Sequence, residues 1–171
     1  QYDPHNGDIL ACSGATGVSL PIRFFTMSDI SHVAIVSNVT VEHIQISMEI
    51  EDELIKQGKR TRKVFTPEVV KNWVPGHRMF ESTTKAGTPC NILGKMFSGV
   101  QVHFPMERIQ EYQGRIWCYR LLPAVSRRFN EYGCNVLSVN LLEDIGVEYD
   151  GKGAIISGTH IVRYWWAWSC A

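Results

Sequence analysis

The 171-residue sequence has no excess of charge of either sign, because 17 basic and 17 acidic residues cancel. A protein that binds nucleic acid through its phosphates needs a basic surface, so this balance argues against a nucleic-acid partner. No apolar run approaches the ~20 residues that a membrane-spanning helix needs, so we expect no transmembrane segment. Residues 1–6 are polar and lack the apolar stretch of a signal peptide.

Several ligand-binding motifs are also missing. The cysteines are five in number and widely spaced, and they form no Cys-x-x-Cys pair, so we expect neither a zinc site nor a redox motif. They are Cys12, Cys90, Cys118, Cys134 and Cys170. The loop 13–17 has small residues but lacks the Lys-Ser/Thr ending of a phosphate loop. No metal or organic cofactor is therefore expected. An odd number of cysteines is explained most simply by reduced thiols, and at least one of these is a candidate nucleophile. The alternative of one or two disulfide bonds is also open.

The composition is that of an ordinary folded domain, with 44% apolar and 20% charged residues. The length suits one domain over 1–171, without repeats or low-complexity linkers. The charged segment 49–72 is longer than a minimal core needs. We interpret it as an excursion or lid that carries specificity.

Strands and helices are both predicted by the apolar patterns. Strands are expected after the turn at 7–8 and over 32–36, 39–48, 78–82, 100–104 and 115–121. Helices are expected from Ser19, over part of 49–62, over 66–73 and 106–112, and over 124–145 with a break near Gly133. This pattern indicates an α+β fold in which helices pack against a central, mostly antiparallel sheet.

One histidine has the position that a catalytic base needs. His32 begins the apolar strand 32–36, so its ring would be held firmly at the sheet edge and still be reachable. Glu81 ends the strand 78–82 and can lie beside His32 in the same sheet. Cys170 follows a tryptophan-rich segment, 164–168, and can approach from a helix packed on that sheet. A thiol, an imidazole and an orienting carboxylate are the parts of a cysteine hydrolase or acyltransferase.

Other residues compete for these roles. Cys12 precedes His32 and ends a strand, which makes it a second candidate thiol. Cys90 lies in a loop and is a candidate surface thiol, whereas Cys118 and Cys134 are most simply packed side chains. His103 shares a strand face with Gln101 and is either a rival orienting residue or a surface residue.

Short motifs follow one another along the chain in a distinctive order. They are Gly-Asp-Ile-Leu at 7–10, Ile-Arg-Phe-Phe at 22–25, Ser-His-Val-Ala-Ile-Val at 31–36, Phe-Glu-Ser at 80–82, a strand at 116–122, Gly-Val-Glu-Tyr-Asp at 146–150 and Ser-Cys at 169–170. In these motifs and in their order the sequence resembles circularly permuted NlpC/P60 papain-like hydrolases, which are related to lecithin:retinol acyltransferase-like proteins.

The resemblance implies a papain-like fold and a thiol hydrolase. Cys170 would be the nucleophile, His32 the base, Glu81 its orienting partner, and Tyr149 a pocket residue that donates to the oxyanion. In the family a helix begins at the cysteine, and in this sequence one residue follows Cys170.

The implied substrate is an amide bond in a peptidoglycan peptide, which would place the protein at the cell envelope, in the periplasm or outside the cell. Two alternatives stay open. One is a thiol acyltransferase or lipase that acts on lipid acyl groups, with the tryptophan-rich end and Phe24 and Phe25 lining an apolar pocket. The other is a catalytically inactive binding module that uses the same cleft.

Overall fold

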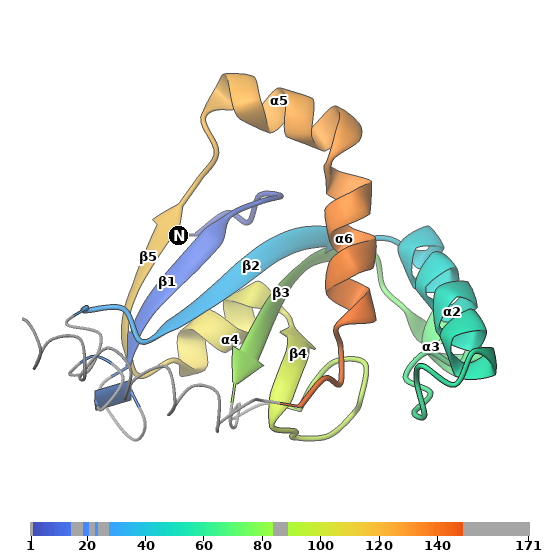
Figure 1. Ribbon diagram of the computed structural model, residues 1–171. Helices are drawn as coiled ribbons and strands as arrows, with labels where there is room; N and C mark the ends of the chain where they lie inside the picture. Colours follow the sequence, from blue (N-terminus) through green and yellow to red (C-terminus); the bar gives the residue numbers. More distant parts are fainter. Residues whose placement is uncertain (1, 15–18, 21–22, 24–27, 84–88, 149–171) are drawn as a thin grey trace, which may run out of the picture.

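The computed structural model describes residues 2–14, 19–20, 23, 28–83 and 89–148 (Figure 1). Within these residues the fold is α+β, with a five-stranded sheet and helices packed on it. The strands are β1 (Ile9–Gly14), β2 (His32–Val39), β3 (Gly76–Thr83), β4 (Gly99–His103) and β5 (Gly114–Tyr119). The helices are α2 (Val41–Lys56), α3 (Pro67–Asn72), α4 (Pro105–Glu111), α5 (Pro123–Tyr132) and α6 (Cys134–Glu143). The predicted mostly antiparallel sheet is confirmed.

The strand order is β4-β3-β2-β1-β5, and every neighbouring pair is antiparallel. β1 lies between β2 and β5, so the first and last strands of the sheet are direct neighbours. Gly114 begins β5 with φ of +155°, and a Cβ there would lie 2.1 Å from the carbonyl oxygen of Ser13. Glycine is thus required at this close approach of the two strands.

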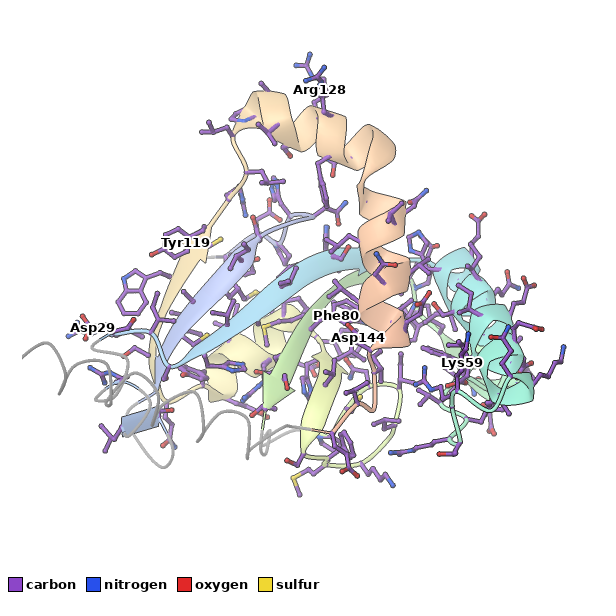
Figure 2. All side chains as sticks on the ribbon, viewed as in Figure 1. Asp29, Lys59, Phe80, Tyr119, Arg128 and Asp144 are labelled. Carbon is purple, nitrogen blue, oxygen red and sulfur yellow. The ribbon has the colours of Figure 1, made fainter. Side chains whose placement is uncertain are left out.

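Each face of the sheet has its own apolar cluster. On one face, α2, α3 and α6 pack over β2, β3 and β4 around Phe80, Val102 and Leu142 (Figure 1). Figure 2 shows Phe80 at the foot of α6. On the opposite face, a smaller cluster around Leu10, Ala34, Val36 and Met79 packs against residues of α4. We call this second face the α4 face.

One predicted strand, 39–48, is wrong, because β2 ends at Val39 and residues 41–48 form about the first two turns of α2. The alternation of β-branched residues suggested a strand, but Thr40 begins a capping box instead. Its hydroxyl accepts a hydrogen bond from the backbone N–H of His43, whose Nδ1 accepts one from the N–H of Thr40. The buried residues of the helix, among them Ile44, Ser47 and Glu51, also follow helical spacing.

The other predicted strands and helices that fall on described residues agree with the structure, apart from shifts of their ends. The break at Gly133 separates α5 from α6. In the excursion 49–72, Val64 and Phe65 belong to the larger core, and buried Glu51 accepts hydrogen bonds from both of their backbone N–H groups. The lid role of this segment stays a prediction. The helix expected from Ser19 falls largely outside the described residues, as does the tryptophan-rich segment 164–168.

Over the described part of the chain, no helix combines the length and apolar character needed to cross a membrane.

Candidate active site

The structure brings the predicted base and the predicted orienting carboxylate together on the α4 face. His32 is the first residue of β2, and Glu81 lies on β3 opposite Ala34. Residues two apart on a strand share a face, so His32 and Glu81 are diagonal neighbours. Their contact joins residues that are 49 positions apart in the sequence.

The contact is a short hydrogen bond, with Nε2 of His32 2.6 Å from Oε2 of Glu81. The His32 side chain keeps 19% of its surface exposed, while that of Glu81 keeps 1%. An ionised carboxylate only accepts hydrogen bonds, so Nε2 carries the proton and Nδ1 is the acceptor of the neutral ring. Nδ1 has no hydrogen-bond partner among the described residues. It is therefore the nitrogen available to another proton donor.

Arg108 of α4 holds the second oxygen of the carboxylate. Its Nε donates to Oε1 of Glu81 over 2.6 Å, and the arginine is itself mostly buried. Burial alone would raise the pKa of Glu81, but the hydrogen bonds from His32 and Arg108 lower that pKa to about 2. Glu81 is thus ionised at neutral pH and fixed at both oxygens. The sequence analysis missed Arg108, because nothing in its local pattern indicates which way the side chain turns.

A second histidine lies close to the same carboxylate. His103 and Gln101 share the α4 face, as predicted, but both are fully buried, so the surface alternative for His103 is wrong. Nε2 of His103 lies 3.6 Å from Oε1 of Glu81, beyond hydrogen-bond distance. Burial lowers the pKa of His103, against the opposing charge of Glu81. His103 is therefore a neutral neighbour of the pair, and it does not hold the His32 ring.

Cys12, the rival thiol, pairs directly with His32 across β1 and β2. It is buried, and its Sγ lies 3.8 Å from the backbone oxygen of Leu10. Burial, together with the charge of Glu81, raises the pKa of the Cys12 thiol to about 11. The thiolate is the nucleophile, so this environment works against Cys12 as the reactive cysteine.

The remaining described cysteines are free thiols. Two predictions about them are wrong. Cys90 is buried in the larger core, because its loop lies along β4, where the backbone N–H of Val102 faces the Cys90 thiol and the N–H of Asn91 donates to the Val102 oxygen. Cys118 is exposed, because β5 is an edge strand. Cys134 is buried at the start of α6, as predicted.

The two other predicted site residues, Cys170 and Tyr149, lie outside the described residues. Within the described ranges, no group of three His, Cys, Asp or Glu side chains is arranged to hold a metal ion. What the described residues provide is a mostly buried imidazole with one exposed part, oriented by a buried carboxylate that an arginine fixes in turn. This arrangement can accept a proton at Nδ1 and return it.

Comparison with known proteins does not assign the chain to a family: no protein-family model, curated protein or solved structure matches it.

Proposed function

We propose that the chain is a papain-like cysteine hydrolase of the permuted NlpC/P60 type, which cleaves an amide bond in a peptidoglycan peptide. The observation that carries this proposal is the 2.6 Å hydrogen bond between His32 and Glu81, with Arg108 on the second carboxylate oxygen. A purely structural histidine needs no such arrangement, whereas a general base needs a fixed tautomer and a free second nitrogen. The order of the sequence motifs supports Cys170 as the nucleophile.

In this mechanism Nδ1 of His32 accepts the proton of the Cys170 thiol, and the thiolate attacks the carbonyl carbon of the scissile amide. The tetrahedral oxyanion would be stabilised by the backbone N–H of Cys170 and the hydroxyl of Tyr149. Protonated His32 then gives its proton to the leaving amine, which leaves a thioester. Water attacks the thioester with His32 as base, releasing the acid and the free thiol. Glu81 stays ionised throughout and stabilises the imidazolium.

The test is iodoacetamide labelling of the full chain across pH, followed by peptide mapping. We expect Cys170 to label fast at or below neutral pH, because a neighbouring imidazole favours its thiolate. His32→Ala should slow this labelling. His77→Ala is the matched control, since His77 lies on β3 away from the Glu81 carboxylate and should leave the rate unchanged.

Labelling of Cys170 that rises only above the ~8.5 pKa of an ordinary thiol would contradict the proposal and favour a binding module. Cys118 serves as an internal reference, because it is accessible to the reagent, while partial desolvation and the charge of Asp8 raise its pKa. If the thiol is reactive, the rates at which the chain cleaves amide and ester substrates are compared next. Amide cleavage supports the peptidase, whereas cleavage of lipid esters alone supports the alternative acyltransferase or lipase.

A further inference from the structure

One face of the sheet exposes four large apolar side chains of β1, β2 and β5 around the small, buried Ala11. It is the face opposite the α4 face, at the end where β1, β2 and β5 extend beyond the helices (Figure 1). Strand pairing puts Ile9 opposite Tyr119, and it puts Ala11 opposite both Val33 and Trp117. The four larger side chains lie in adjacent cross-strand rows and are between 37% and 57% exposed. We call this surface the β5 face.

The helix that follows β5 extends the apolar surface. Leu122 and Val125, at the start of α5, are 73% and 50% exposed. α5 projects beyond the sheet and reaches it mainly through α6 (Figure 1). Exposing leucine and valine side chains to water is unfavourable in free energy. Their exposure on a projecting helix therefore indicates an apolar or interfacial partner.

The same stretch is positively charged, although the whole chain has no net charge. Between Glu111 and Glu131 the sequence has four arginines and no acidic residue. Arg120 is paired with Asp8. The other three are exposed and take part in no ion pair among the described residues; they are Arg115, Arg127 and Arg128.

The three arginines lie on two consecutive elements, Arg115 on β5 and Arg127 and Arg128 on α5. Arg115 lies on β5 two residues before Trp117, so both side chains point to the β5 face. Figure 2 shows Tyr119 beside β5 and Arg128 on the outer side of α5.

We propose that the β5 face and α5 together bind an anionic membrane surface. Tryptophan and tyrosine combine an apolar ring with a polar tip, which suits the boundary between headgroups and acyl chains. Arg115, which shares this face with Trp117, and the exposed arginines of α5 complement anionic headgroups. A second copy of the chain complements this surface poorly, because a symmetric contact would bring arginines together without a carboxylate from this stretch. The proposal does not depend on the hydrolase activity.

The test is sedimentation of the full chain with vesicles of phosphatidylcholine alone, or of phosphatidylcholine with 30% phosphatidylglycerol (roughly the anionic fraction needed to give a negative surface). We expect binding only to the anionic vesicles and weaker binding at high salt. Arg115→Gln/Arg128→Gln should lower the partition coefficient about thirtyfold at low salt, because each arginine near the surface contributes about 1 kcal/mol. Tyr119→Ser should also weaken binding, and circular dichroism should show both variants folded.

Matched controls carry equal changes elsewhere on the surface. Lys71→Gln/Lys95→Gln removes two exposed charges, and Met96→Ser removes an exposed apolar side chain. The proposal is overturned if the wild type stays in solution with anionic vesicles, or if the controls weaken binding as much as the β5-face variants. It is also overturned if Tyr119→Ser abolishes self-association in the absence of vesicles, or if an acidic peptide binds the face and vesicles do not.

Discussion

At the scale of single residues, the Glu81 carboxylate is held at both of its oxygens. It is buried in the middle of the sheet, and each of its oxygens accepts a hydrogen bond from a different element, β2 or α4. From the sequence, His32 was expected at the start of one strand and Glu81 at the end of another strand of the same sheet. The pairing of β2 with β3 then brings the two side chains into contact. Arg108 was not predictable, because its contact depends on how α4 packs on the sheet, which no local pattern encodes.

The lowered pKa of Glu81 makes stability depend on pH. A carboxyl group whose pKa is lower in the folded than in the unfolded state stabilises the fold above its unfolded pKa. That stabilisation is lost as pH falls toward the folded pKa of about 2. We expect Glu81→Gln to lower the free energy of unfolding by about 3 kcal/mol at pH 7, and the difference from wild type to shrink below pH ~4.5. Urea unfolding at several pH values measures this.

The matched control for this prediction is Glu49→Gln, at an exposed position of α2. It should change the free energy of unfolding by less than about 0.5 kcal/mol at any pH. A wild-type advantage over Glu81→Gln that stays constant from pH 7 to pH 3 would show that the ionised carboxylate is not the source of the effect.

At the scale of elements, α2 shows where sequence patterns fail and why. Its β-branched residues alternate well enough to suggest a strand, and no Glu or Gln stands at the third helical position to mark the usual capping box. His43 takes that role with its imidazole and also bonds the side chain of Asn135, which ties α2 to α6. Of the strands that were predicted correctly, β1, β3, β4 and β5 lie next to a glycine or proline, which is a stronger signal. β2 has no such neighbour and was predicted from its apolar run alone.

The cap of α2 gives a direct test of that element. Thr40→Ala removes the hydroxyl that accepts the His43 backbone N–H, so we expect a loss of about 1 kcal/mol in the free energy of unfolding. The midpoint of urea unfolding measures this loss. Thr61→Ala, in an exposed loop, should be nearly neutral. Equal losses in the two variants would mean that the hydroxyl is not acting as a cap.

At the scale of the whole molecule, the sheet separates the main core from the candidate site. The helices α2, α3 and α6 build the larger cluster on one face, while His32, Glu81 and Arg108 lie on the other. The antiparallel sheet could be predicted from the order of short strands. The sequence did not predict which strands the helices cover or that the β5 face is exposed. Both depend on where each helix packs on the sheet.

This separation predicts that the core can be weakened while the site geometry persists. Leu142 of α6 is fully buried in the larger cluster, so Leu142→Ala should lower the free energy of unfolding by about 2–5 kcal/mol. Val136→Ala, at an exposed position of the same helix, should cost less than about 1 kcal/mol. Under native conditions the imidazole NMR signals of His32 should match the wild type in both variants, because its partners lie across the sheet. A shifted His32 signal in Leu142→Ala alone would show instead that the packing of α6 sets the position of β2 and β3, and that the two faces are mechanically coupled.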